Sequence, residues 1–87
     1  MEEILRREGY MYTQIIEKDL TAGQALDKCI KENKKVTRQI WKGYWVLADV
    51  TTFTKPIITA ILKNNEGVVV ATPYQEDLLA TDWMVVE

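Results

Sequence analysis

The residues best suited to chemistry lie in one ten-residue stretch, Val36 to Trp45. It contains one arginine, Arg38, and the large aromatic side chains Trp41, Tyr44 and Trp45. Flat aromatic rings can stack on a nucleobase, and a fixed positive charge can pair with a phosphate. The same residues also suit a core strand with a solvated edge, because large aromatic side chains dominate protein cores. The stretch therefore predicts either a nucleotide-binding site or a part of the hydrophobic core.

Positive charge gathers around this stretch, although the whole chain has a formal net charge of −2. Six basic residues and one acid lie between Lys28 and Lys42, whereas four acids and no base lie between Glu76 and Glu87. A net negative charge gives no general attraction to a nucleic-acid polymer. A polymer of nucleic acid is therefore not an expected partner.

Further candidates for ligand contacts offer a ring, a charge or a hydrogen-bonding group: Lys34, Lys35, Phe53, Thr54, Tyr74, Gln75 and Asp77. The rings could stack on a base, and the polar groups could bond to ribose hydroxyls or to a base edge. An ion pair of Arg38 with Asp77 or with Asp82 would instead make these residues structural. Lys34 and Lys35 would equally suit a solvated edge. The sequence leaves these alternatives open.

Catalytic side chains are scarce in this chain. It has no histidine, no serine and a single cysteine, Cys29, so triad chemistry is excluded and a metal site is not expected. Cys29 falls on the apolar face of an expected helix, which is typical of a small buried side chain. The four glycines are scattered and form no phosphate-binding loop. The inventory predicts a binding protein that has no catalytic residues and needs no cofactor.

A capped helix precedes the aromatic stretch. Thr21 and Gln24 have the spacing of a capping box, and Asn33 can take the left-handed conformation that often follows a helix. The apolar residues between them recur with the period of one helical face: Ala22, Ala25, Leu26, Cys29 and Ile30. We expect a helix from Ala22 to Glu32.

After this helix the apolar period changes to that of β-strands. We expect strands at Val36–Trp41, Tyr44–Val50, Ile57–Leu62, Val68–Ala71 and Trp83–Val86, with a turn at Asn64–Gly67 and a turn or short helix at Pro73–Leu79. The predicted fold class is α+β. One capped helix in the N-terminal half of the chain packs on a mainly antiparallel sheet of about five strands.

The length of 87 residues allows one small core, so we expect a single nucleotide-binding domain over residues 20–87. Residues 1–19 are expected to be an N-terminal extension that packs on the domain or on a partner subunit. A core this small often gains from self-association, so a homo-oligomer is expected. The sequence shows no run of 18 apolar residues and no signal-peptide pattern. With one cysteine, these features predict a soluble protein of a reducing cell interior.

Four motifs occur in an order that resembles the phage Thoeris anti-defence type 2 family: TAGQAL, KKVTRQIW, PIITAILKNNEGVVV and PYQEDLLATDWMVV. The last contains the signature Pro-x-x-x-Asp-x-x-Ala-x-Asp-Trp, which begins at Pro73 and ends at Trp83. The resemblance covers Leu20 to Glu87. The sequence departs from the pattern of this family at Asn33, where glycine is usual, and at Ala71, where an aromatic residue is often found.

The resemblance implies a phage protein that acts in the cytoplasm of the bacterial host. It would bind and sequester, without cleaving it, a cyclic ADP-ribose isomer that the host's defence enzyme makes from NAD. Some relatives also take up cyclic dinucleotides. The family is similar in forming homo-oligomers, expected to be tetramers, with ligand pockets where subunits meet.

Two other functions remain open from the residues themselves. One is a protein-interaction module that inhibits or regulates a host or phage protein through exposed aromatic side chains. The other, less favoured by the residue inventory, is an enzyme that cleaves the nucleotide.

Overall fold

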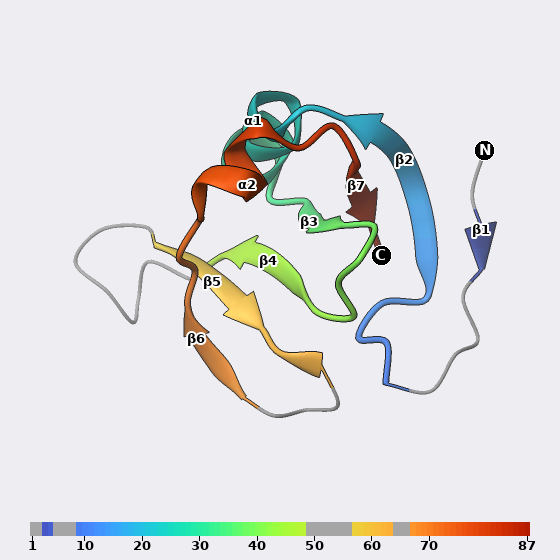
Figure 1. Ribbon diagram of the computed structural model, residues 1–87. Helices are drawn as coiled ribbons and strands as arrows, with labels where there is room; N and C mark the ends of the chain where they lie inside the picture. The colour runs from blue at the N-terminus through green and yellow to red at the C-terminus, as the bar shows by residue number, and fades with distance from the viewer. Residues whose placement is uncertain (1–2, 5–8, 49–56, 64–66) are drawn as a thin grey trace.

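The computed structural model describes residues 3–4, 9–48, 57–63 and 67–87. These residues form two helices and one antiparallel sheet, so the predicted α+β class is confirmed (Figure 1). The helices are α1 (Ala22–Glu32) and α2 (Gln75–Leu79). The strands are β1 (Glu3–Ile4), β2 (Gln14–Leu20), β3 (Lys35–Arg38), β4 (Tyr44–Leu47), β5 (Ile58–Ile61), β6 (Val68–Val70) and β7 (Trp83–Val86).

The seven strands of the described residues pair in the order β1-β2-β7-β3-β4-β5-β6, and every pair is antiparallel. The last strand in the sequence, β7, lies between β2 and β3. The prediction of about five strands was too low, because β1 and β2 come from the segment expected to be an N-terminal extension. β2 pairs directly with β7, so this part of the segment packs on the domain.

Helix α1 begins and ends where its sequence predicts. The Thr21 hydroxyl accepts from the Gln24 N–H at 3.2 Å, and the Gln24 side chain accepts from the Thr21 N–H at 2.9 Å. Asn33 ends the helix in the left-handed conformation, with φ of 54°. Both ends are therefore fixed by local hydrogen bonds and backbone preference.

The core lies on both faces of the sheet. On one face, α1 contributes Ala25 and Cys29, which pack in a cluster with Trp45 and Trp83. Burial raises the pKa of the Cys29 thiol, so this cysteine is a structural side chain. On the other face, Tyr12 packs in a second cluster with side chains from β2 and β7. All four residues of β7 are buried, because both of its faces are covered.

Strand β3 ends at Arg38, three residues before the predicted end at Trp41. The chain turns there because the Trp41 N–H donates to the Arg38 carbonyl at 2.9 Å. Strand β4 ends at Leu47. Ala48 lies outside the strand, so the predicted continuation is wrong at this residue. Residues 49 and 50 of the predicted strand, and the candidates Phe53 and Thr54, lie outside the described residues. No helix in the described part of the chain is long and apolar enough to cross a membrane.

Candidate functional site

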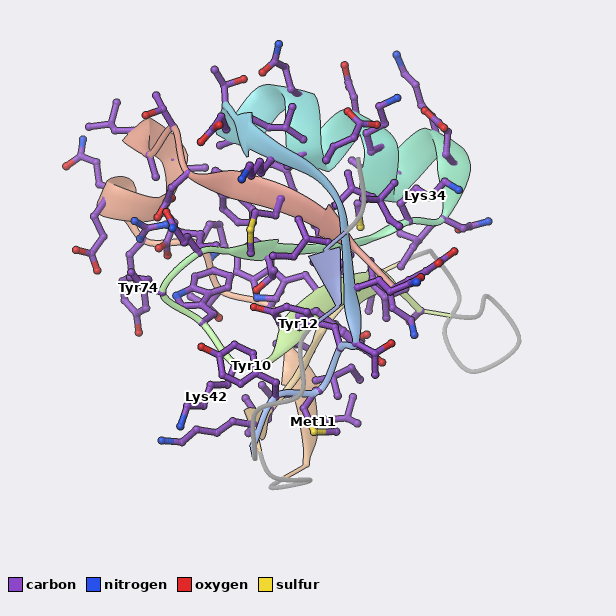
Figure 2. The ribbon with its side chains drawn as sticks, turned by 90° about the vertical axis from the view of Figure 1, so that its right-hand side faces the viewer. Tyr10, Met11, Tyr12, Lys34, Lys42 and Tyr74 are labelled. Atoms are coloured by element: carbon purple, nitrogen blue, oxygen red, sulfur yellow. The ribbon has the colours of Figure 1, made fainter. Side chains whose placement is uncertain are left out.

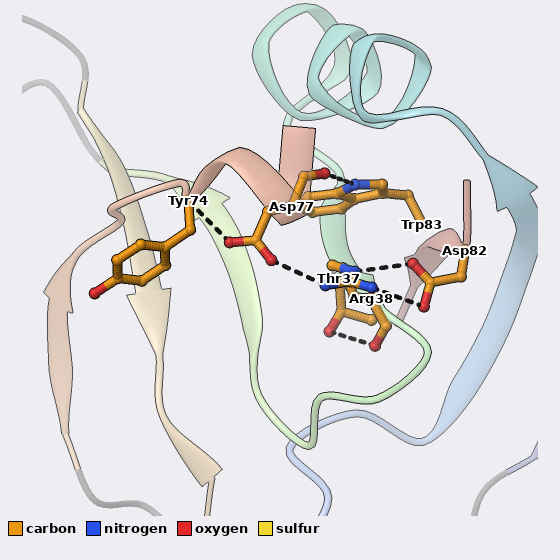
Figure 3. A network of polar contacts seen from close by, with 6 residues as sticks. All are labelled: Thr37, Arg38, Tyr74, Asp77, Asp82 and Trp83. Carbon is orange, nitrogen blue, oxygen red and sulfur yellow. Dashed lines mark hydrogen bonds and ion pairs between the residues drawn. The ribbon is translucent and has the colours of Figure 1, made fainter. Parts of the chain in front are cut away.

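Arg38 stands at the end of β3 between two carboxylates (Figure 3). Its Nε donates to Asp82 Oδ1 at 2.9 Å and its Nη2 donates to Asp82 Oδ2 at 3.3 Å. Its Nη1 donates to Asp77 Oδ1 at 3.0 Å. The Asp82 carboxylate is the main group that raises the pKa of the Arg38 guanidinium, and Asp77 adds to this rise. The ion pairs that the sequence left open are both present.

The same carboxylate of Asp77 fixes the start of α2. The Asp77 Oδ2 accepts from the Tyr74 N–H at 3.0 Å. The backbone carbonyl of Asp77 accepts from the Trp83 indole N–H at 2.8 Å. The Asp77 side chain is 5% exposed, so these bonds form away from water. Together they join α2 to β3 and β7. Arg38, Asp77 and Asp82 therefore have a structural role in this arrangement.

The three tryptophans form one packed group next to this network. Trp41 lies 5.2 Å from Trp45 and 5.3 Å from Trp83, measured between ring centroids. Trp45 and Trp83 are buried, whereas Trp41 is only half-buried. The Arg38 guanidinium lies 6.0 Å from the centre of the Trp41 ring. Trp41 is therefore held on one side by the core and exposes its remaining surface.

A pocket of about 440 Å³ opens beside Trp41. Among the described residues, its lining comes from the turn and first residues of β4 and from the end of β5: Ile40, Trp41, Lys42, Gly43, Tyr44, Trp45, Ala60, Ile61, Leu62 and Lys63. Its volume lies within the range of about 300–1,000 Å³ that is usual for small-molecule sites. The lining therefore includes three aromatic residues and two lysines.

The walls of this pocket meet because of β-strand register and Gly43. Tyr44 pairs with Ile61, and Trp45 pairs with Ala60. A Cβ atom on Gly43 would collide with the Ile61 carbonyl, so only glycine allows the turn to approach β5 this closely. The Thr37 hydroxyl donates to the Gly43 carbonyl at 2.6 Å and holds the turn to β3.

Tyr44 also has a contact with a lysine of β3. The Lys35 Nζ lies 5.0 Å from the centre of the Tyr44 ring, which is a cation–π distance. Lys35 is half-buried and so has a packing partner, whereas Lys34 is exposed.

Apart from Lys34 and Lys35, the candidate residues that the structure describes divide into three groups. Trp41, Tyr44 and Trp45 line the pocket. Arg38 and Asp77 belong to the ion-pair network. Tyr74 and Gln75 are exposed at the start of α2, and the Tyr74 ring points away from the network in Figure 3.

The second wall of the pocket, from Ala60 to Lys63, was missed from the sequence. These residues are an ordinary strand end by type, and only the pairing of β5 with β4 brings them to the aromatic stretch. Gly43 offered a partial indication, because a glycine between two aromatic strands often marks a close backbone approach.

Metal-binding clusters are not found among the described residues, in which no three ligand-type side chains gather. The described lining of the pocket also contains no carboxylate, imidazole or thiol. The arrangement can bind a flat anionic molecule through stacking and through ammonium groups.

The fold and the pocket thus define a small α+β domain with an aromatic, positively charged binding site. Residues 20–86 match the Tad2-like family, described as the Thoeris anti-defense 2-like domain. The chain belongs to this family, and the membership supports a role in countering Thoeris defence. A search of curated proteins found no match to the chain.

Proposed function

We propose that the protein binds and sequesters a cyclic nucleotide signal of the host's defence, namely a cyclic ADP-ribose isomer, and does not cleave it. The observation that carries this proposal is the pocket of about 440 Å³, whose lining includes Trp41, Tyr44, Lys42 and Lys63. A cyclic ADP-ribose contains an adenine that can stack on a ring and a pyrophosphate that carries two negative charges. The two lysines provide two positive charges.

Stacking on an exposed aromatic face contributes on the order of 1–3 kcal/mol per base. Trp41 suits this role because the neighbouring tryptophans hold its ring and leave part of it exposed. Both lysines are exposed at the rim, so they can reach phosphate oxygens without first losing their hydration to burial. The affinity should fall as salt concentration rises, because such exposed charges are screened.

Sequestration is favoured over cleavage by the groups that line the pocket. Acid–base or nucleophilic chemistry commonly uses a carboxylate, an imidazole or a thiol. The described lining residues offer none of these. A protein that sequesters its ligand must bind it tightly and be present in excess. A chain of 87 residues can be synthesised quickly in large amounts. The proposed place of action is the cytoplasm of the bacterial host.

Calorimetry with cyclic ADP-ribose and its isomers tests the pocket. Lys42→Gln and Lys63→Gln each remove one charge from the rim, and each should weaken binding by about tenfold or more, since a charge-assisted hydrogen bond contributes about 1.5–3 kcal/mol. Lys31→Gln is the matched control, because Lys31 is exposed on α1 and pairs with Asp27 at 3.9 Å. An equal loss of affinity in all three variants would show that general charge, and not this pocket, controls binding.

We also propose that the chain assembles into a homo-oligomer, expected to be a tetramer. The edge strand β6 carries three exposed valines, Val68 to Val70, and α2 carries the exposed side chains of Leu78 and Leu79. Natural proteins rarely leave an apolar edge strand uncovered. The uncharged β6 can pair with the β6 of a second copy without opposing like charges. The α2 surface would supply the second interface that a closed tetramer requires.

Light scattering of wild type and Val69→Lys tests the assembly. The variant should shift the oligomer to a smaller species, because lysine on an edge strand opposes pairing. Gln39→Lys makes the same change of charge in the exposed turn after β3 and should leave the size unchanged. A wild type that is monomeric at micromolar concentration would overturn this part of the proposal. If it also bound no nucleotide, the protein-interaction module would become the better account.

A further inference from the structure

The turn that lines the pocket is fixed at three successive backbone carbonyls. The Trp41 carbonyl accepts from the Tyr12 hydroxyl at 3.0 Å, and the Lys42 carbonyl accepts from the Met11 N–H at 2.8 Å. The Gly43 carbonyl accepts from the Thr37 hydroxyl, as described above. Two of these three donors come from one short segment, Tyr10–Tyr12, which lies far upstream in the sequence.

Tyr12 is itself held firmly. It is 3% exposed, and it packs in the cluster with Ile15, Met84 and Val86. Its ring meets the Tyr10 ring edge to face, with centroids 5.5 Å apart. Burial raises the pKa of Tyr12 to about 12, with a further rise from Tyr10, so the hydroxyl keeps its proton and remains a donor at neutral pH. A rigid donor fixes the position of the carbonyl that it bonds.

The same segment also reaches one of the pocket's cations. The Lys42 Nζ lies 6.0 Å from the centre of the Tyr10 ring, and Figure 2 shows these two side chains next to each other. The segment therefore contacts the turn through a side-chain hydroxyl, a backbone amide and an aromatic face. All three contacts converge on Trp41 and Lys42, the residues that the proposed site uses for stacking and charge.

We infer that Tyr10–Tyr12 is a brace for the ligand pocket and that Tyr12 is a positioning residue, which holds Trp41 and Lys42 in their binding geometry through the Trp41 carbonyl. This inference rests on the proposed function of the pocket. The brace lies outside residues 20–86, the part of the chain that matches the family. Residues upstream of the matched region thus belong to the functional unit.

The variant Tyr12→Phe removes the hydroxyl and keeps the buried ring. Thr13→Val is the matched control, because it removes one hydroxyl from the residue that directly follows the segment, but Thr13 is exposed and bonds to the Glu87 carbonyl at 3.3 Å instead of to the turn. Amide hydrogen exchange, measured without ligand, should be about fivefold or more faster in residues 39–44 of Tyr12→Phe, since the hydrogen bond to the part-buried Trp41 carbonyl is lost. Exchange in α1 should be unchanged in both variants.

Calorimetric titration with cyclic ADP-ribose follows on the same proteins. Tyr12→Phe should bind about 3–10-fold more weakly than wild type, whereas Thr13→Val should bind like wild type. A variant whose exchange rises equally in α1 and in the turn would show a general structural role and would overturn the inference. Unchanged exchange in the turn, or faster exchange with unchanged affinity, would also overturn it.

The two proposals fail in different ways. If wild type binds no nucleotide, the proposed function fails, and the inference is then decided by hydrogen exchange alone, with unchanged exchange in residues 39–44 as the contradicting result. If wild type binds and Tyr12→Phe binds equally well, the proposed function stands and the brace does not.

Discussion

Replacing Arg38 with lysine separates the two roles that the sequence allows for this residue. The guanidinium makes three hydrogen bonds, two to Asp82 and one to Asp77, from a side chain that is 13% exposed. A lysine keeps the charge, but its single ammonium cannot reach both carboxylates with this geometry. The Asp77 carboxylate would then lose a partner at a buried position.

The expected cost follows from these contacts. Each charge-assisted hydrogen bond contributes about 1.5–3 kcal/mol, and the remaining ammonium and incoming water recover part of the loss. We therefore expect Arg38→Lys to lower the free energy of unfolding by about 2–4 kcal/mol. In a domain of this size such a loss lowers the melting temperature by roughly 10–25 °C.

Thermal unfolding and calorimetric titration with cyclic ADP-ribose should be measured on the same protein. The folded variant should bind within about threefold of wild type, whereas loss of a phosphate contact would weaken binding by about tenfold to a hundredfold. A double-mutant cycle with Asp82→Asn should show a coupling of about 0.5–3 kcal/mol between the two residues. An unchanged melting temperature with a large loss of affinity would refute the structural role and return Arg38 to the ligand site.

Three further changes test single features of the structure. Thr21→Ala should lower the free energy of unfolding by about 0.5–2 kcal/mol in urea denaturation, because α1 loses its cap; an unchanged value would contradict the capping bonds. Gly43→Ala should lower the free energy of unfolding by about 1–3 kcal/mol and weaken nucleotide binding, because its Cβ collides with the Ile61 carbonyl. Gly23→Ala should be neutral or stabilising, because its added Cβ meets only Thr21 Oγ1, at an ordinary contact distance of 4.0 Å. Folding raises the pKa of Tyr12 from 10.0 to about 12. The protonated hydroxyl therefore contributes fully to folding stability below pH 10, and this contribution is lost as the pH rises toward 12. Between about pH 10 and 12, the free energy of unfolding of wild type should thus fall by up to about 3 kcal/mol more than that of Tyr12→Phe. Equal falls in the two proteins would contradict the burial of this hydroxyl.

Local patterns predicted the elements whose determinants are local. The helix bounds followed from Thr21, Gln24 and Asn33, which form the cap and the left-handed end within a few residues of the helix. β7 was also predicted at its full length, because its residues have strong strand preference. Strand β2 was not predicted as part of the domain, since its place depends on pairing with β7 at the other end of the chain.

The site could be predicted only in part, because it too depends on contacts between residues that are far apart in the chain. The sequence identified the aromatic stretch, and the structure brings Trp41, Tyr44 and Trp45 to one pocket. It could not decide whether Arg38 meets a phosphate or a carboxylate, because both Asp77 and Asp82 lie about forty residues away in the chain and are placed by the fold. The wall from β5 and the Tyr12 hydroxyl are likewise long-range contacts that no local pattern marks.

The family membership and the pocket are two different kinds of observation, and both support the proposed function. The match rests on residues 20–86 as a sequence, whereas the pocket rests on how two segments of that sequence meet. The upstream residues Met11 and Tyr12 add donors to the turn from outside the match. A truncation that begins at residue 20 should therefore lose both β2 pairing and the brace.

The most direct test of the central claim is the fate of the nucleotide. Purified protein in excess is mixed with a cyclic ADP-ribose isomer, the free nucleotide is measured after ultrafiltration, and the retained protein is then denatured by heat. Mass spectrometry of the released material identifies the molecule. Sequestration predicts that the free nucleotide is depleted and then recovered intact, and that Lys42→Gln retains less of it. Recovery of a cleaved product, or no depletion at all, would contradict the claim.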